Sequence, residues 1–518
     1  MSSHPLALFS LKPCCSRAEG VVAHPSNRHL VSELNDGTLA IDIGFNIRSR
    51  SCGTLATLGR GDTDIFVEGS SISKVQCSFE IDPETNVIML YDRSHSQTTQ
   101  VFGENAIPFQ HGRLRKIVVQ EGLNGIVGMG GVGQNLVMFA LQWHQGPSQT
   151  MERVRSRPKQ GYAEDPRLAR TVDLSETAPL SRIGTRTHTP GPRKLVVRYK
   201  KMMELGAGSF GTVHKAIDVD TGKFMAVKVL REENRDRRST LKREVEILST
   251  LGHPHIVDYI TSQGWDDLRV EIFMGLKEGN LESLVEKVGQ SYISTIAETV
   301  FNHMLQALDF LAVKKIIHRD VKPENILYIS RGDAGHHFQL GDFGVCNNFN
   351  NATTVVGTPA FMAPEIQNGT QTCKMDVWSL FVTMLWTLDV KRFRQKSQNF
   401  ASQDSVYQAV SAAAVDPIVN PIREMARTDP EERASAAQML VKCFGRVGLT
   451  TPQKDVQPVK PDRSKNAAEA TTAQVQTRRF GQNKFRVQRR RPMQEESGSG
   501  RPFRSRAKKR HFQDKQEV

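Results

Sequence analysis

Residues 318–325 read HRDVKPEN, and a second short motif, DFG, follows at 342–344. These motifs constrain the chain more than its composition does, because together they supply groups that phosphoryl transfer requires. One carboxylate has to accept or orient the proton of an attacking hydroxyl, and the pattern indicates Asp320. Oxygen ligands have to hold magnesium ions against phosphates, and the pattern indicates Asn325 and Asp342.

The upstream segment 206–213 reads GAGSFGTV, in which glycines let backbone amides approach phosphate oxygens. A dinucleotide-binding loop would lead into a helix, whereas this one leads into the alternating segment 212–217, which predicts a strand. The following apolar strand at 226–229 contains Lys228, which needs an anion there. A phosphate pair and Glu244, on the next predicted helix, are the anions that we expect; the alternative is that Glu244 is a solvated helix charge.

With APE at 363–365 added, residues 195–447 resemble the eukaryotic protein kinases. The resemblance implies a two-lobed α+β fold, with ATP and Mg²⁺ as cofactors. Lys322, two residues after the catalytic Asp, and the GTP triplet at 357–359 resemble the branch that phosphorylates serine and threonine in protein substrates.

The resemblance also implies a role for each matching residue. The catalytic set is Asp320, Lys322, Lys228 and Glu244. The ATP-binding set is Leu205, Gly206, Gly208, Gly211, Val213, Ala226, Lys228, Met274 and Leu276, with Phe273 as gatekeeper and the backbone of Met274 and Leu276 on adenine. The metal ligands are Asn325 and Asp342. The structural pairs are Glu365 with Arg433, and the helix at 376–379 with the loop that it braces.

Arg319 beside Asp320 adds a cation that kinases of this arrangement neutralise with a phosphate on the activation loop. The resemblance places that phosphate on Thr354, with Thr353 as the second choice, and it implies an upstream activating kinase. The alternative is that both are ordinary loop threonines.

A separate domain is expected at 30–145, after an N-terminal segment at 1–29. Residues 1–145 hold no helix-period pattern, and their short alternating or apolar runs, separated by turn residues, predict an all-β sandwich. The predicted strands lie at 38–43, 87–91, 116–119 and 136–141.

Loop residues of this domain resemble the forkhead-associated (FHA) domain, a β-sandwich that binds phosphothreonine. The motifs are LGRG at 58–61, ISKVQCSFEI at 72–81 and YDRSHSQT at 91–98. The resemblance implies a phosphothreonine site made of Arg60, Ser73, Lys74 and Ser96. Gln76, Ser96 and Gln97 replace the usual His, Asn and Gly, and the alternative is a structural sandwich with an incidental surface arginine.

Residues 146–194 are rich in Arg, Pro, Ser, Thr and Gly and predict a linker. The basic tail at 448–518 lacks apolar periodicity and is expected to be disordered. Residues 451–518 hold 18 Lys and Arg against 7 Asp and Glu, which is +11 of the chain's formal net charge of +14. This charge favours nuclear import, with a contact to nucleic acid as a second role and a merely solvated tail as the alternative.

No run reaches the ~18 apolar residues that a membrane span requires, so we expect no membrane association. The domain order resembles the DNA-damage checkpoint kinases. It implies a nuclear kinase, shuttling with the cytoplasm, that phosphothreonine proteins recruit and that forms a transient homodimer. The alternative functions are a phosphopeptide-binding scaffold with a weakly active kinase domain, and a nucleic-acid-binding protein that acts through its tail.

Overall fold

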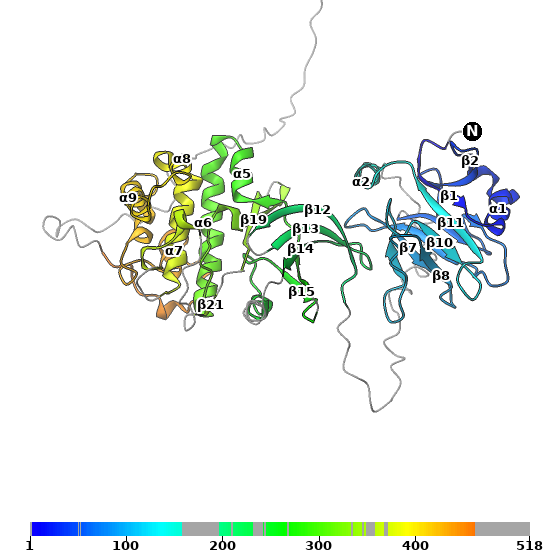
Figure 1. Ribbon diagram of the computed structural model, residues 1–518. Coiled ribbons are helices and arrows are strands. Elements are labelled where there is room, and N and C mark those ends of the chain that lie inside the picture. The colour runs from blue at the N-terminus through cyan, green and yellow to red at the C-terminus, as the bar shows by residue number, and fades with distance from the viewer. Residues whose placement is uncertain are drawn as a thin grey trace, which may run out of the picture. The chain divides into compact units, whose positions relative to one another are not determined.

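Figure 1 shows the computed structural model, in which the described residues are 3–49, 51, 53–157, 196–208, 211–231, 242, 245–266, 269–332, 335–343, 347–348, 358–366 and 371–461. By its internal contacts the chain divides into two units, Met1–Pro461 and Asp462–Val518. The second unit lies outside the described residues.

The N-terminal region is a β-sandwich of two sheets. The six-stranded sheet has the order β2-β3-β1-β11-β10-β8, and the five-stranded sheet has the order β5-β4-β6-β7-β9. The strands are β1 (Ala7–Pro13), β2 (Val31–Glu33), β3 (Leu39–Gly44), β4 (Thr54–Gly59), β5 (Ile65–Phe66), β6 (Cys77–Ile81), β7 (Ile88–Asp92), β8 (Thr99–Phe102), β9 (Lys116–Val118), β10 (Ile126–Met129) and β11 (Val137–Trp143). Phe9 on β1 and Phe79 on β6 are both buried, and their ring centroids lie 5.1 Å apart, so the sheets pack face to face.

The four predicted strands are confirmed as β3, β7, β9 and β11. The separate segment at 1–29 is wrong, because β1 pairs with both β3 and β11 inside the larger sheet. The absence of helices is also wrong. The helix α1 (Ser16–Ala23) buries Ala18, Val21 and Val22, a helical spacing that is too short to stand out in the sequence. A short 3-10 helix, Pro25–Leu30, follows it.

The predicted linker begins with ordered structure. The helix α2 (Pro147–Arg155) buries Val154, and the Arg153 guanidinium donates hydrogen bonds to the carbonyl oxygens of Pro5 and Ala7. These contacts attach α2 to the sandwich, so the linker prediction is wrong for this helix. Residues 158–194 lie outside the described residues.

The second region begins with a five-stranded antiparallel sheet of order β12-β13-β14-β16-β15. Its strands are β12 (Tyr199–Gly208), β13 (Gly211–Asp218), β14 (Phe224–Arg231), β15 (Tyr259–Gln263) and β16 (Arg269–Gly275). A mainly helical lobe follows. The two parts are the lobes that the sequence predicts, and they place the strands of the first beside the loops of the second.

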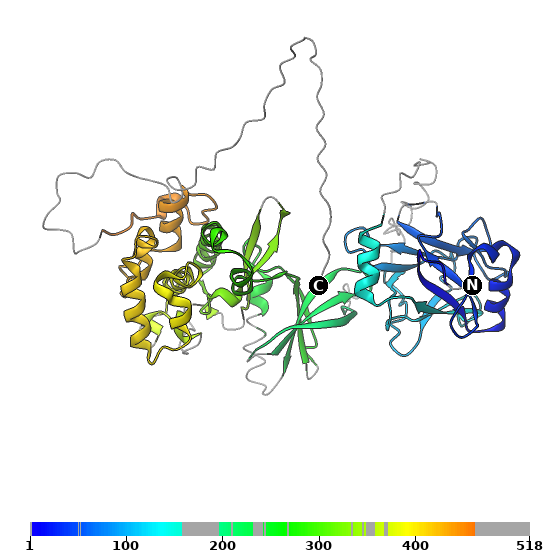
Figure 2. The same ribbon diagram turned by 90° about the horizontal axis from the view of Figure 1, so that it is seen from above.

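In the helical lobe the long helices α6 and α7 lie side by side (Figures 1 and 2). The helices are α5 (Leu281–Lys287), α6 (Gln290–Val313), α7 (Lys374–Thr387), α8 (Phe393–Ser397), α9 (Gln403–Ala414) and α10 (Ala436–Phe444). Short strands are β17 (Gly279–Asn280), β18 (Ile316–Ile317), β19 (Ile326–Ser330), β20 (His336–Leu340) and β21 (Asn347–Asn348). Short 3-10 helices are Pro323–Asn325, Pro359–Phe361, Pro364–Ile366, Val390–Arg392, Asn420–Ala426 and Gln453–Asp455. Among the described residues, no helix combines the length and apolarity that crossing a membrane demands.

The start of the predicted disordered tail is ordered instead. Residues 448–461, called the strap below, run along α6 and α10. The Asp309 carboxylate on α6 is 1% exposed and accepts the Thr450 and Thr451 N–H groups at 2.7 and 2.9 Å, together with the Thr451 hydroxyl at 2.5 Å. The Gln438 side-chain amide donates to the carbonyl oxygens of Gln457 and Pro458. The prediction was wrong here because these contacts are backbone donors and acceptors, which composition does not reveal.

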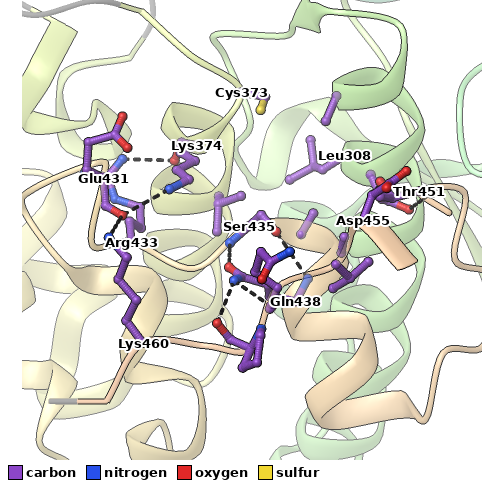
Figure 3. A pocket seen from close by; sticks show the side chains of 18 of the residues that line it. Leu308, Cys373, Lys374, Glu431, Arg433, Ser435, Gln438, Thr451, Asp455 and Lys460 are labelled. Atoms are coloured by element: carbon purple, nitrogen blue, oxygen red, sulfur yellow. Dashed lines mark hydrogen bonds between the residues drawn. The ribbon is translucent and has the colours of Figure 1, made fainter. Parts of the chain in front are cut away.

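The strap borders an open pocket of about 590 Å³ that α6, α7 and the start of α10 also line. Figure 3 shows Leu308 and Lys374 from these helices and Thr451 and Asp455 from the strap among the lining residues. The strap therefore belongs to the packed lobe.

We predict that Asp309→Ala lowers the melting temperature of the helical lobe by several degrees. The substitution removes the acceptor of three strap donors, and a hydrogen bond to a charged group contributes about 1.5–3 kcal/mol. Differential scanning calorimetry of the full chain measures the change. Thr451→Val is the graded control because it removes only the hydroxyl donor and should cost less. Equal melting temperatures for wild type and Asp309→Ala would show that the hydrogen bonds between Asp309 and the strap do not stabilise the lobe.

Candidate active site

The hairpin of β12 and β13 forms the glycine-rich end of the first lobe. Its register pairs Gly206 with Val213 and Gly208 with Gly211. Gly211 has φ +142°, and a Cβ there would lie 2.2 Å from the Val229 carbonyl oxygen, so only glycine fits. A Cβ at Gly206 would meet no atom within 4 Å, so Gly206 borders open space rather than packed side chains.

The neighbouring strands β14 and β16 decide which side chains share a face with Lys228. Lys228 lies opposite Ile272 and Ala226 opposite Met274, whereas Val227 lies opposite Phe273. Side chains alternate between the two faces of a sheet, so Phe273 and Lys228 point to opposite faces. Phe273 is 0% exposed and packs in the other face's core, edge-on to Tyr199.

The gatekeeper assignment to Phe273 is therefore wrong. Met274 is the residue of this strand end whose side chain lies on the Lys228 face. A one-residue shift in the assignment of a strand moves every side chain to the wrong face. The sequence at 270–275 gives no warning of such a shift, because both faces of the strand carry apolar residues.

The loop that carries Asp320 is held from below by α7. The Asp376 carboxylate accepts the backbone N–H groups of His318 and Arg319, each at 2.8 Å. Burial raises the pKa of Asp376 to about 7, and these two hydrogen bonds act in the opposite direction, toward the ionised form. The buried His318 ring donates from Nε2 to the Gly341 carbonyl oxygen at 2.9 Å, and burial lowers its pKa. The loop is thus attached both to α7 and to the residue that precedes Asp342.

Three side chains, those of Asn325, Lys322 and Thr358, converge on the Asp320 carboxylate. Asn325 donates to Asp320 Oδ2 at 2.9 Å, and Lys322 Nζ lies 2.9 Å from the same oxygen. Thr358 donates to Asp320 Oδ1 through its N–H at 3.1 Å and its hydroxyl at 2.9 Å. Lys322 Nζ also donates to Thr358 Oγ1 at 2.6 Å. This geometry orients the carboxylate and surrounds it with donors.

Asp342 lies across from this cluster and pairs with Lys228, whose Nζ is 2.6 Å from Asp342 Oδ1. Asp342 has φ 53°, in the left-handed region that is costly for a residue other than glycine. Asn325 uses its amide nitrogen on Asp320, which leaves its amide oxygen as an acceptor. Carboxylate and amide oxygens are the ligands that Mg²⁺ prefers, so Asn325 and Asp342 fit that ion.

The structure does not describe every predicted site residue. Leu205, Val213 and Ala226 lie on the strands of the glycine-rich hairpin and its neighbour, and Leu276 follows β16. Glu244, Thr353 and Thr354 lie outside the described residues. The predicted pair of Glu365 and Arg433 is present, with two hydrogen bonds at 2.6 and 2.9 Å.

The candidate phosphothreonine loops lie at one end of the sandwich. Arg60 is exposed, and its Nε donates to the Ile72 carbonyl oxygen at 2.7 Å, beside Ser73 and Lys74. Gln76 is buried; its Oε1 accepts the Ser73 N–H at 2.9 Å, and its Nε2 donates to Thr98 Oγ1 at 3.0 Å. Gln76 therefore connects the loop that holds Ser73 to the loop that holds Thr98.

Ser96, the fourth predicted phosphothreonine ligand, is exposed on the loop that follows β7. The next residue, Gln97, has φ 53°, so it adopts the left-handed turn that a glycine adopts more easily. The sequence did not predict three features of these sites: the Thr358 hydrogen bonds to Asp320, the Gln76 hydrogen bonds that join two loops, and the face that Met274 occupies. The GTP triplet at 357–359 was a signal for the first only.

Comparison with known proteins gives the family of the second region. Residues 199–444 match the family model of the protein kinase domain. Calcium-dependent protein kinase 5 of Plasmodium berghei (strain Anka) is 36% identical over 186 residues, which is 35% of this chain and 32% of that protein. Serine/threonine-protein kinase dst1 of Dictyostelium discoideum is 34% identical over 195 residues, 36% of this chain and 25% of that protein.

Serine/threonine-protein kinase 10 of Mus musculus is 32% identical over 195 residues, 35% of this chain and 20% of that protein. The matched part thus spans a third or less of these relatives' length. Residues 199–444 form a protein kinase domain similar to those of serine/threonine kinases, and such a domain uses ATP and Mg²⁺. The predicted enzyme class and cofactors are confirmed.

We predict that Thr358→Val lowers kcat roughly ten- to hundredfold, because hydrogen bonds to charged groups contribute about 1.5–3 kcal/mol and tenfold in rate corresponds to about 1.4 kcal/mol. Steady-state kinetics on a peptide substrate measure the effect. Thr358→Ser keeps the hydroxyl and should retain most of the activity. A loss shared equally by the two variants would mean that the methyl group, and not the hydrogen bonds to Asp320, matters.

Proposed function

We propose that this chain, through the kinase domain at residues 199–444, transfers the γ-phosphoryl group of ATP to serine or threonine hydroxyls of protein substrates, and that its sandwich recruits it to phosphothreonine. The observation that carries the first part is the Asp320 carboxylate, which Asn325 and Thr358 orient and which lies beside Lys322.

Each residue of this cluster has a role that follows from its chemistry. Mg²⁺ bound with ATP offsets the charge that develops on the phosphates. Asp320 orients the substrate hydroxyl and accepts its proton. Lys322, held between Asp320 and Thr358, presents its ammonium group to the transferring phosphoryl oxygens. Lys228, at 2.6 Å from Asp342 Oδ1, positions that carboxylate and the α- and β-phosphates.

The face that Met274 occupies sets the adenine contacts. In the arrangement implied by the kinase resemblance, the two adenine-binding backbone groups lie one and three residues after the gatekeeper. With Met274 as gatekeeper, these groups belong to Gly275 and Lys277. Leu205 and Val213, from the hairpin above, cover the adenine.

Activation follows from Arg319, which sits in the braced loop one residue before Asp320 and is 6% exposed. A phosphate on Thr354, or on Thr353, offers a dianion with three acceptor oxygens that a guanidinium binds in bidentate fashion. An upstream kinase, or a second copy of this chain in a transient homodimer, supplies that phosphate. We propose this as the switch of the kinase domain.

Recruitment rests on the Gln76 bridge, which gives the loops of Arg60, Ser73 and Ser96 a defined arrangement although the usual histidine is absent. The domain order favours a role in DNA-damage checkpoint or cell-cycle signalling. The basic segment 462–518 favours nuclear import, with shuttling to the cytoplasm and a contact to nucleic acid as further roles.

We predict that Asp342→Asn and Lys228→Met each reduce phosphoryl transfer by ~10²–10³, as removal of single electrostatic groups does in other active sites. Purified full chain, labelled ATP, Mg²⁺ and a basic serine peptide form the assay. Arg60→Ala is the matched control and keeps wild-type activity on this peptide. If wild type binds nucleotide but transfers no label, the chain is a phosphopeptide scaffold; losses below tenfold in both variants would refute the site.

We predict that Arg60→Ala weakens binding of a phosphothreonine peptide at least tenfold, because a charge-assisted hydrogen bond contributes about 1.5–3 kcal/mol. Calorimetric titration of the full chain with a phosphothreonine peptide library measures this, and the unphosphorylated library should not bind. Arg48→Ala removes another exposed arginine of the sandwich and should leave the affinity unchanged. Equal binding of the phosphorylated and unphosphorylated libraries by the wild-type protein would contradict the prediction and would mean that the sandwich is a structural domain.

A further inference from the structure

Three histidines outside the phosphoryl-transfer site come together from separate parts of the kinase domain. His255 lies in the segment before β15, His303 on α6 and His337 on β20. One ring nitrogen from each can be chosen so that all three lie within 4.8 Å of one another. Their ring centroids are 3.9 Å apart for His255 and His303, and 4.9 Å apart for His255 and His337.

Backbone groups hold one nitrogen of each ring. His255 Nδ1 donates to the Phe338 carbonyl oxygen at 3.0 Å, and His337 Nε2 donates to the Pro254 carbonyl oxygen at 2.8 Å. Their second nitrogens, His255 Nε2 and His337 Nδ1, therefore carry lone pairs. A histidine that donates one N–H to a carbonyl and presents the other nitrogen is the usual arrangement of a metal ligand.

His303 completes the group from the helix side. Its Nδ1 accepts the Phe338 N–H through a long bond of 3.3 Å. Its side chain is partly exposed, so an ion and its water can enter from solvent. In a tetrahedral zinc site with bonds of 2.0–2.1 Å, ligand atoms lie about 3.4 Å apart, so atoms that are 4.8 Å apart have to approach by about 1.4 Å. The rings of His255 and His303 are stacked at 17° to each other, so they also have to tilt until both lone pairs point at the ion.

The three side chains offer imidazole nitrogens as ligands. Charged groups face the cluster with both signs: Arg331 and Lys277 are positive, and Asp258 is negative. Neutral imidazoles select zinc and related divalent transition metals over Mg²⁺ and Ca²⁺, which prefer oxygen.

We propose that His255, His303 and His337 bind one Zn²⁺ ion, with water in the fourth position, as a second metal site of the kinase domain. The ion joins the segment before β15, α6 and β20. Val257 and Leu340 already link two of these elements, since the Val257 N–H donates to the Leu340 carbonyl oxygen at 2.9 Å. β20 leads directly to Asp342, so the bound ion steadies the strand that ends at the phosphoryl-transfer site.

The test uses the full chain after treatment with EDTA and dialysis. ZnCl₂ is added, the excess is removed, and bound zinc is counted by atomic emission while calorimetry records the melting temperature. We expect one zinc per chain and a melting temperature raised by several degrees, because a ligand that binds only the folded state stabilises it. His303→Gln and His337→Gln should each lose this zinc and this shift.

His336→Gln is the matched control, because His336 neighbours His337 on β20 but points to the opposite face. It should keep both the zinc and the shift. Each variant is compared with its own metal-free form, so a general loss of stability does not count as loss of zinc; if His303→Gln fails to fold, His337→Gln decides alone. No bound zinc in the wild type, or equal zinc in the wild type and the His337→Gln variant, would overturn the proposal.

Discussion

The loop that carries Asp320 depends on one buried carboxylate. Asp376, on α7 inside the lobe, accepts the backbone N–H groups of His318 and Arg319, and Arg319, the residue before Asp320, has φ 72°. A left-handed residue other than glycine persists only where its surroundings fix it. Two hydrogen bonds to an ionised group, each stronger than a neutral one, supply that fixation. Without them the burial that raises the pKa of Asp376 would favour its neutral form, and the loop would lose its anchor.

From this anchor the rest of the site follows by short connections. The His318 ring donates a hydrogen bond to the Gly341 carbonyl oxygen. This bond fixes the start of the segment that carries Asp342 relative to the loop. Asn325 ends the 3-10 helix Pro323–Asn325, and its side-chain amide donates a hydrogen bond to the Asp320 carboxylate. Thr358 reaches the same carboxylate from a part of the chain far along the sequence. The Asp320 carboxylate therefore joins its own loop, through Asn325, to the segment that carries Thr358.

Gln76 joins two loops of the sandwich at the position where the FHA resemblance expects a histidine. A histidine and a glutamine share little chemistry, yet Gln76 places an acceptor on Ser73 and a donor on Thr98, so the loops remain joined. Gln97 takes up the left-handed turn at some cost in strain. The two loops are thus joined through the backbone N–H of Ser73 and the side-chain hydroxyl of Thr98, both of which the Gln76 amide reaches.

The sequence by itself determined the kinase domain, its cofactors and the grouping of Lys322 and Asn325 with Asp320, because each motif carries a chemical group that the reaction needs at a fixed distance along the chain. It also determined the sandwich strands β3, β7, β9 and β11 through their alternation of side chains. Tertiary structure alone decided which face Phe273 and Met274 occupy, since apolar residues on both faces leave the register open.

Tertiary structure also decided the contacts that join distant segments. β1 enters the middle of a sheet, the strap binds Asp309, and three histidines meet from positions 255, 303 and 337. These contacts rest on backbone hydrogen bonds and on side chains far apart in the sequence. No local pattern records them, because the partners are neighbours only once the chain has folded.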